Sequence, residues 1–300
     1  MIVIEAEGLK KNFGNVKALR GISFEVKRGE IFGFLGPNGA GKTTTVRILT
    51  CILKPDSGKA RINSYDVVRD TLKAKQSIGV LPEVSNAYPD LTAWQNIMLI
   101  ASLYGMRRSE AEARANELLK EFGIHERKDA KIRGFSKGMK QRLMLSMALI
   151  SDPEIIFLDE PTSGLDVQSA RMIREKILEI ANERKTVFLT SHNMDEVNLL
   201  CDRVAIVNKG KIVTIDTPER LKSRVGGNVA IEVSFGDKAE LNLENAERFG
   251  NKYVIYTTNP YKTICEVVDF ARKSGTKMIS INTRTPTLED AFLKLLEMER

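Results

Sequence analysis

Long hydrophobic runs are missing from this sequence. A membrane-spanning helix needs roughly 18 consecutive apolar residues, and the longest candidates, Ile97–Leu103 and Leu143–Ile150, are far shorter. Residues 1–5 lack the charged region and the long apolar region of a secretory signal peptide. We therefore expect a soluble globular protein whose first residues form a β-strand.

Cysteine is also scarce, with three residues in 300. Cys51, Cys201 and Cys265 lie far apart and show no metal-ligand spacing. This pattern argues against a cysteine-based metal centre and favours buried thiols in a reducing compartment.

A basic stripe with interleaved aromatic residues is absent too. The net charge of +7 is compatible with nucleic acid or an anionic membrane surface as a partner. However, Lys and Arg are spread along the whole chain beside Asp and Glu, so the charge does not single out a binding face. No nucleic-acid partner is expected.

What the sequence does contain is a phosphate-binding loop. The run Gly36–Thr43 fits the pattern G-x-x-x-x-G-K-[ST]. The apolar run Ile31–Leu35 before it predicts a buried strand, and Thr44–Leu49 after it can open a helix. In this context, the loop amides and the helix N-terminus bind a polyphosphate. Lys42 reaches the outer phosphates, and the hydroxyl of Thr43 can ligate Mg²⁺.

Two patterns surround this loop. Between Val3 and Val26, apolar and polar residues alternate, which predicts half-buried antiparallel strands. Residues 91–122 change to a helical period with a break at Gly105, which predicts a helical insertion.

The second half of this region alternates strands with helices. Apolar runs at 154–160, 186–190 and 204–207 predict buried strands, and Ile173, Ile177 and Ile180 form one face of a helix. Alternating strands and helices indicate a mostly parallel α/β sheet.

The Gly226–Gly227 pair near residues 223–228 indicates a domain boundary. We expect one domain at 1–222, with a helical subdomain at about 88–150, and a small α/β domain at 228–300. Expected in the small domain are strands at 229–235, 253–256 and 278–281 and helices at 261–273 and 288–298. Thr287 followed by Asp290 has the spacing of a capping box.

Four further motifs carry chemistry. Ser136 opens a helix and can form a second anion site with its amides. Asp159 and Glu160 end an apolar strand, where adjacent buried carboxylates need a nearby cation. Asp159 suits a role at Mg²⁺, and Glu160 suits a general base for an attacking water. Residues 163–166 form a tight loop, and His192 follows a predicted strand.

Together these motifs resemble the ATP-binding subunit of an ABC transporter over roughly residues 2–217. Residues 36–43 resemble the Walker A loop, 135–139 the signature motif, 155–160 Walker B, 163–166 the D-loop, and His192 the switch histidine. The resemblance implies an α/β P-loop NTPase fold, ATP hydrolase activity, and ATP and Mg²⁺ as cofactors.

The resemblance also implies a role for each matching residue. The catalytic residues would be Glu160, His192 and Lys42. The metal ligands would be Thr43, Asp159 and Glu83. The nucleotide contacts would be Phe13, whose ring would stack on adenine, and Val16, Gly36, Pro37, Asn38, Gly39, Ala40, Gly41, Lys42, Thr43, Thr44, Ser136, Gly138 and Asp166.

The chain departs from the family pattern at three positions. Lys137 and Met139 replace the usual glycine and glutamine of the signature, and Glu83 stands where a glutamine is usual. Glu83 can still ligate Mg²⁺, although it adds negative charge beside the triphosphate. These features and the tail motif at 287–292 resemble the ABC-2 type exporters, which carry drugs, ions or lipid-like cargo.

By this resemblance, two copies bind head to tail around two ATP, most simply as a homodimer. The partner that crosses the membrane is a separate subunit, and it docks a short helix into a groove formed by the Glu83 loop and the helices at 91–122. The chain would lie at the cytoplasmic face of the cell membrane. The sequence does not identify the cargo.

Three alternatives remain open at this point. A soluble ABC ATPase acting on nucleic acid or ribosomes usually has two cassettes or a long coiled coil, and neither is present here. A kinase or GTPase leaves the signature and His192 unexplained, and no Asn-Lys-x-Asp motif occurs. The C-terminal domain could bind a regulatory ligand, dimerise or brace the ATPase domain.

Overall fold

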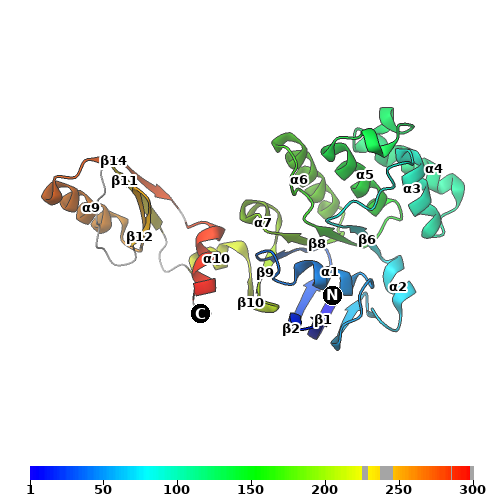
Figure 1. Ribbon diagram of the computed structural model, residues 1–300, viewed down its shortest axis with the longest axis horizontal. Coiled ribbons are helices and arrows are strands. Elements are labelled where there is room, and N and C mark those ends of the chain that lie inside the picture. Colours follow the sequence, from blue (N-terminus) through cyan, green and yellow to red (C-terminus); the bar gives the residue numbers. More distant parts are fainter. Residues whose placement is uncertain (225–228, 237–245, 285, 298–300) are drawn as a thin grey trace. The chain divides into compact units, whose positions relative to one another are not determined.

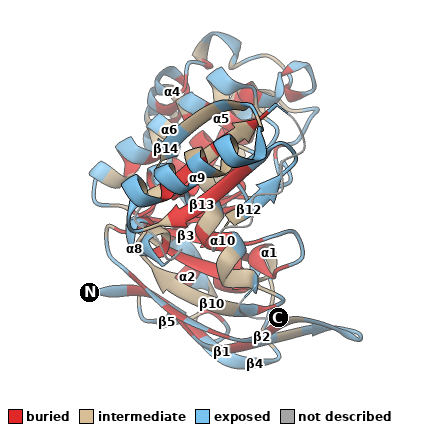
Figure 2. Ribbon diagram, turned by 90° about the vertical axis from the view of Figure 1, so that its left-hand side faces the viewer, coloured by how far each residue is buried: buried red, intermediate tan, exposed pale blue. Residues whose placement is uncertain are grey.

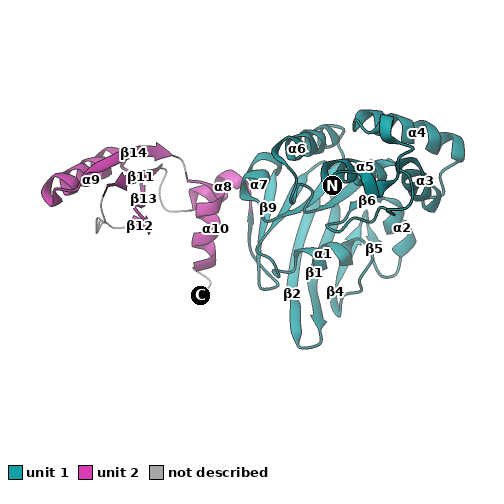
Figure 3. Cartoon of the chain, turned by 45° about the horizontal axis from the view of Figure 1, so that its top comes forward, with its two compact units in different colours: residues 1–215 teal, residues 216–300 magenta. Residues whose placement is uncertain are grey.

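The computed structural model describes residues 1–224, 229–236, 246–284 and 286–297 (Figure 1). The chain divides into two compact units, unit 1 at Met1–Ile215 and unit 2 at Asp216–Arg300 (Figure 3). Unit 2 therefore includes α8 (Pro218–Ser223), which the sequence had placed in the first domain, and α8 packs against α10 (Leu288–Glu297). The Gly226–Gly227 pair, where the boundary was expected, lies outside the described residues.

A six-stranded sheet in the order β10-β9-β3-β8-β7-β6 forms the centre of unit 1. Its strands are β3 (Ile31–Leu35), β6 (Ile78–Leu81), β7 (Ile155–Asp159), β8 (Thr186–Ser191), β9 (Arg203–Asn208) and β10 (Lys211–Asp216). Strands β9, β3, β8, β7 and β6 pair in parallel, as the alternating pattern predicted. Strand β3 is buried along its whole length (Figure 2). Because parallel strands end at one edge, the residues that follow β3, β7 and β8 lie together there.

A second sheet of unit 1, in the order β2-β1-β4-β5, contains the antiparallel strands expected near the N-terminus. These are β1 (Ile2–Phe13), β2 (Val16–Lys27), β4 (Ser57–Ile62) and β5 (Tyr65–Asp66). Phe24 on β2 packs with Phe32, Phe34 and Phe188 of the parallel sheet, at ring-centroid distances of 5.5–5.7 Å. This packing fixes the β1–β2 hairpin against the sheet and carries Phe13 and Val16 at the hairpin tip.

Helices cover both faces of the parallel sheet, with α5, α6 and α7 on one side and α1 toward the antiparallel sheet on the other (Figure 1). The predicted helical region contains two helices separated by Gly105, whose φ is 72°. The helices of unit 1 are α1 (Lys42–Leu49), α2 (Thr71–Gln76), α3 (Ala93–Leu103), α4 (Arg108–Glu121), α5 (Lys137–Leu149), α6 (Val167–Asn182) and α7 (Met194–Leu200), with short 3₁₀ turns at His125–Arg127 and Ile132–Gly134. No helix among the described residues is long and apolar enough to cross a membrane.

Unit 2 is a four-stranded antiparallel sheet in the order β12-β13-β11-β14 with α9 packed against β11. The elements are β11 (Val229–Phe235), β12 (Ala246–Phe249), β13 (Lys252–Thr257), α9 (Pro260–Ser274) and β14 (Met278–Arg284), besides α8 and α10. The predicted strands and helices are confirmed, whereas β12 was missed. Of the thiols expected to be buried, Cys201 is buried, but the expectation is wrong for Cys265, which is exposed.

Gly79 on β6 marks a close approach of two backbones in unit 1. A methyl group added there would lie 2.0 Å from the carbonyl oxygen of Ala148 and 2.9 Å from Cγ of Pro153. We expect Gly79→Ala to lower the free energy of unfolding by roughly 1–3 kcal/mol, because overpacking moves rigid backbone. Urea unfolding measures the loss. Gly134→Ala is the control, since a methyl group there meets nothing within 4 Å, and equal midpoints for the two variants would contradict the prediction.

The predicted capping box of α10 is present in unit 2. The hydroxyl of Thr287 accepts from the amide of Asp290 at 3.2 Å, and Asp290 Oδ2 accepts from the amide of Thr287 at 2.7 Å. Arg284 donates to Asp290 at 2.5 Å and to Glu232 at 2.7 Å. Burial by itself raises the pKa of the Asp290 carboxyl, but hydrogen bonds from Arg284, Thr287 and Tyr256 outweigh it and hold that pKa below its usual value.

This lowered pKa predicts acid sensitivity of unit 2. A carboxyl whose folded pKa lies below its unfolded pKa stabilises fully above the unfolded pKa, near 3.9, and loses that contribution as pH falls toward the folded pKa. We expect β13 to lose about 1–3 kcal/mol of hydrogen-exchange protection between pH 5 and pH 2. Asp290→Asn is expected to remove this pH dependence, and Asp269→Asn on α9, a matched substitution, is expected to keep it. An unchanged pH dependence in Asp290→Asn would refute the assignment.

Candidate functional site

The glycine-rich loop lies between β3 and α1, as the sequence predicted. Helix α1 begins at Lys42, and Gly41 before it has a φ of 106°, a conformation that favours glycine. A methyl group on Gly36 would lie 2.4 Å from the carbonyl oxygen of Val207 on β9. Both glycines are therefore required by the path of the loop, which leaves the N-terminus of α1 facing solvent-accessible space.

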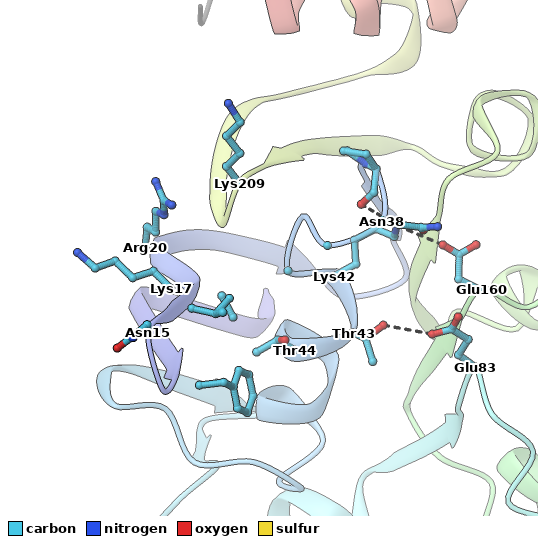
Figure 4. Close-up of a pocket in the computed structure, with 16 residues that line it drawn as sticks. Asn15, Lys17, Arg20, Asn38, Lys42, Thr43, Thr44, Glu83, Glu160 and Lys209 are labelled. Atoms are coloured by element: carbon cyan, nitrogen blue, oxygen red, sulfur yellow. Dashed lines mark hydrogen bonds and ion pairs between the residues drawn. The ribbon is translucent and has the colours of Figure 1, made fainter.

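A cavity of about 670 Å³ opens in front of this loop (Figure 4). Eleven of the residues singled out from the sequence line it: Phe13, Val16, Pro37, Asn38, Gly39, Gly41, Lys42, Thr43, Thr44, Glu83 and Glu160. Gly36, Ala40, Asp159, His192, Ser136, Gly138 and Asp166 are not among its lining residues. The volume suits a nucleotide-sized ligand.

Lys42 is almost fully buried at the base of the cavity. Its ammonium donates to the carbonyl oxygen of Gly36 at 2.7 Å and lies 3.3 Å from Oε1 of Glu160. The loop carbonyl and the carboxylate thus hold a positive charge at the point where α1 begins. A positive charge at a helix N-terminus, together with the amide groups of a loop, favours the binding of phosphate.

Glu160 lies directly after β7 in the left-handed region, with a φ of 54°. Its amide donates to the carbonyl oxygen and the hydroxyl of Thr190 on β8, both at 3.1 Å. Its Oε2 lies 2.7 Å from Nδ1 of His192. Because a carboxylate only accepts, His192 Nδ1 carries the hydrogen. The structure therefore brings Lys42, Glu160 and His192 into one contact chain.

Three oxygen donors converge beside the loop. The hydroxyl of Thr43 lies 3.5 Å from both Oε2 of Glu83 and Oδ1 of Asp159. Burial raises the pKa of the Asp159 carboxyl; hydrogen bonds from Thr190 and Thr43 oppose this, and the negative charges of Glu83 and Glu160 add to it. Among the described residues, no group of three or more His, Cys, Asp or Glu side chains could hold a metal by itself. A hydroxyl and two carboxylates are hard oxygen donors, which fit Mg²⁺ when phosphate oxygens and water complete its shell.

The residues of the signature motif and the loop at 163–166 lie elsewhere on unit 1. Ser136 caps α5 and accepts from the amide of Met139 at 3.2 Å. Gly138 allows close packing against α6, since a methyl group there would lie 2.4 Å from Oγ of Ser169. Asp166 caps α6 through the amide of Ser169 at 2.8 Å. Within one chain, these residues do not reach the cavity.

Sequence reasoning missed five lining residues: Asn15, Lys17, Ala18, Arg20 and Lys209. Three of these are cationic, and Figure 4 shows Lys17, Arg20 and Lys209 on the side of the cavity away from Glu83 and Glu160. Arg20 lies on β2 within four residues of Val16, so the hairpin that carries Val16 could have pointed to it. No local signal indicated Lys209, which follows β9 far along the chain.

Known proteins resemble this chain in sequence over nearly its whole length. The family model described as ABC transporter matches residues 19–163. The linearmycin resistance ATP-binding protein of Bacillus subtilis is 37% identical over 98% of this chain and 98% of its own length. The Nod factor export ATP-binding protein I of Burkholderia orbicola is 35% identical over 99% of this chain and 97% of its own length.

A solved structure with a similar fold is an ATP-binding cassette in a dimeric post-hydrolysis state bound to ADP and Pi. It has a TM-score of 0.66 and 25% identity and covers 71% of this chain and 98% of that chain. The linearmycin resistance and Nod factor export proteins match nearly the whole length of this chain, unit 2 included.

Proposed function

Because this chain belongs to the ABC transporter family as an ATP-binding and ATP-hydrolysing subunit, we propose that it powers export of a drug, ion or lipid-like cargo through a separate transmembrane subunit. The observation that carries this proposal is the convergence of Lys42, Glu160 and His192 at one sheet edge beside a nucleotide-sized cavity. The curated relatives are named for antibiotic resistance and for Nod factor export, which supports export over import.

The lining residues of the cavity support one orientation of the nucleotide. The terminal phosphates lie against residues 36–44, where the loop amides, Lys42 and the N-terminus of α1 offset their charge. In this orientation the base extends toward the hairpin tip, where Phe13 and Val16 line the cavity. Stacking on an aromatic ring does not depend on hydrogen-bond readout, which suits an exposed ring at the mouth of a site.

Mg²⁺ fits the oxygen donors beside the loop. Thr43, Asp159 and Glu83 would hold it, and when bound it neutralises phosphate charge. Glu83 and Glu160 place further negative charge beside the buried Asp159, which a bound cation would offset. A carboxylate at position 83 gives the ion a stronger ligand than an amide.

Glu160 acts as the general base. It accepts a proton from water while the water oxygen bonds to the terminal phosphorus and the bond to the bridging oxygen of ADP breaks. Products are ADP and inorganic phosphate. His192 orients the Glu160 carboxylate through the Nδ1–Oε2 contact of 2.7 Å, and as an imidazolium it can also donate from its other nitrogen to the phosphate. Lys42 leaves Glu160 for the phosphate when nucleotide enters.

Two chains complete two sites. Ser136, Gly138 and Asp166 do not line the cavity of their own chain, so we place them against the ATP of a second copy in a head-to-tail homodimer. ATP then belongs to both subunits, and its hydrolysis releases the contact. The solved ATP-binding cassette with a similar fold is dimeric and bound to ADP and Pi, which supports a dimer.

The transmembrane subunit would dock a short helix into a groove formed by the Glu83 loop and the helices α3 and α4, with the chain at the cytoplasmic face of the membrane. A hollow of about 450 Å³ lies between these helices, with Trp94, Met98, Leu99 and Met106 among its lining residues. Partly buried apolar side chains that line a groove suit a short amphipathic helix as partner.

Co-purification tests the proposed function. The chain is expressed with a candidate six-span membrane subunit, and ATP hydrolysis is measured in lipid. A stable complex with stimulated hydrolysis supports the proposal. Hydrolysis that responds to nucleic acid and not to the membrane subunit would support the soluble ABC class instead.

The aromatic ring of Phe13 provides a specific prediction. Phe13 is 49% exposed and lines the cavity, so the loss of its ring is not expected to disturb the core. Phe13→Ala should weaken ATP binding by about 1–3 kcal/mol, as base–aromatic stacking does elsewhere, while inorganic triphosphate binds as before. Calorimetry measures both ligands, and Phe13→Trp is expected to retain binding. Equal weakening for ATP and triphosphate would show that Phe13 does not contact the base.

A further inference from the structure

Glu196 is a buried carboxylate that the proposed mechanism does not use. Glu196 lies on α7, four residues after His192, and is only 1% exposed. Asn193 caps the helix by accepting from the amide of Glu196 at 3.0 Å. The backbone of Glu196 is thus held at the start of α7, and its side chain is directed into the protein.

The carboxylate connects two loops. Its Oε1 accepts from the hydroxyl of Thr162 at 2.7 Å, and its Oε2 accepts from the hydroxyl of Ser191 at 2.8 Å. Ser191 also accepts from the amide of Asn193 at 3.0 Å. Both carboxylate oxygens are therefore engaged, each by a different segment of the chain.

These two segments carry the reacting groups. Thr162 is two residues after Glu160, in the loop that continues to Asp166, and Ser191 directly precedes His192. The amide of Leu165 donates to the carbonyl oxygen of Thr162 at 3.2 Å. A shift of Thr162 relative to Ser191 would therefore change both the path of the loop and the contact between Glu160 and His192.

We propose that Glu196 is a positioning residue for hydrolysis: by bridging Thr162 and Ser191, it fixes the loop at 161–166 and His192 in register with each other. The proposed function assigns a contact with the second subunit to Asp166, in the same loop. Glu196 therefore also links that contact to the orientation of His192. Glu196 does not touch the nucleotide. It acts through the geometry of Glu160 and His192.

A carboxylate is well suited to this bridge. Both of its oxygens accept, and both partners are hydroxyls that can donate. Alanine would leave two hydroxyls near the core without this acceptor. Glutamine has the same shape and still offers one acceptor and one donor, and a hydroxyl can reverse its role, so the bridge survives in part.

The experiment separates binding, turnover and the state of His192. It uses the full chain with Glu196→Ala, Glu196→Gln, Thr162→Val and Ser191→Ala. ATP affinity is measured by calorimetry, and kcat by phosphate release. Because the chain has two histidines, NMR of isotope-labelled imidazoles reports His192 beside His125, which hydrogen-bonds to Asn116 on α4.

For Glu196→Ala we expect kcat to fall roughly 10–100-fold, as a misplacement of about 1 Å can cause, while the Kd for ATP stays within about twofold. The imidazole signal of His192 should shift and that of His125 should not. Glu196→Gln should keep kcat within about fivefold of the unmodified chain, since it retains hydrogen-bonding capacity. Thr162→Val and Ser191→Ala should each reproduce part of the loss in kcat.

Matched controls are Thr50→Val and Ser146→Ala. Their buried hydroxyls donate to the carbonyl four residues earlier, at 2.8 and 2.9 Å, and do not bind Glu196. Neither should move the His192 signal. The proposal is overturned if Glu196→Ala leaves kcat and the His192 signal unchanged, or if ATP affinity falls together with kcat.

This inference rests on the proposed function, but the two fail differently. If the unmodified chain does not hydrolyse ATP, the proposed function fails. The NMR comparison still decides whether Glu196 positions His192, including when Glu196→Ala unfolds, because Thr162→Val and Ser191→Ala test the same bridge from its other ends.

Discussion

Replacing Glu160 with glutamine is expected to lower kcat by about 10²–10⁴-fold, the range of a general base, while ATP stays bound. Glutamine has the shape of glutamate but cannot take a proton from water. The change also removes the carboxylate 3.3 Å from Lys42, which leaves the ammonium free for phosphate. ATP binding should therefore be as strong as before or stronger.

The same variant should accumulate as an ATP-bound dimer, since hydrolysis is the step that releases the two chains. Size-exclusion chromatography with and without ATP measures this, alongside phosphate release. Glu154→Gln is the matched control, because Glu154 is an exposed glutamate that precedes β7 and pairs with Arg28. A Glu160→Gln protein that stays monomeric with ATP, or that hydrolyses ATP at the rate of Glu154→Gln, would contradict the assignment.

Replacing Lys42 with alanine is expected to abolish ATP binding at micromolar nucleotide. The ammonium is the positive side chain at the base of the cavity, where the loop and Glu160 hold it. Hydrogen bonds to charged groups contribute about 1.5–3 kcal/mol each, so the loss of this group should raise the Kd by about 10²-fold or more. The remaining Glu160 carboxylate would also repel the triphosphate.

Calorimetry with ATP measures this effect. Lys176→Ala on α6 is the control, because Lys176 is also partly buried and ion-paired, to Glu121 and Glu179, but does not line the cavity. It should bind ATP normally. Equal affinity in Lys42→Ala and Lys176→Ala would show that the ammonium does not contact the phosphates. Together the two variants separate binding, which needs Lys42, from turnover, which needs Glu160.

The elements around the phosphate loop were predictable because local signals agree there. Residues 31–35 are apolar enough for a buried strand, the glycines permit the turn, and Lys42 begins a helix. Helical periodicity interrupted by a glycine predicted the two helices on either side of Gly105. The spacing of Thr287 and Asp290 predicted the capping box. Strand β12 was missed because it has four residues and one partly buried side chain, so its alternation is too short to recognise.

The candidate site was only partly accessible to this reasoning. Its motif residues could be named because each lies in a short pattern with a known chemical use. Arg20 and Lys209 line the same cavity without a motif, since they meet the loop through long-range backbone contacts: Arg20 donates to the carbonyl oxygen of Gly210 at 2.7 Å, and Gly210 donates to that of Ala40 at 3.0 Å. Glu196 escaped notice for a similar reason, because its partners are separated from it by up to 34 residues.

The sequence by itself determined the phosphate loop, the alternation of strands and helices, and the family to which this chain belongs, since these depend on spacing between residues close along the chain. Only the tertiary structure decided which groups meet. The parallel order of β3, β8 and β7 brings Lys42, Glu160 and His192 to one edge, although up to 150 residues separate them in the sequence. It also decided that Glu196 bridges two loops, because such contacts arise when separate strands and helices pack around a common core.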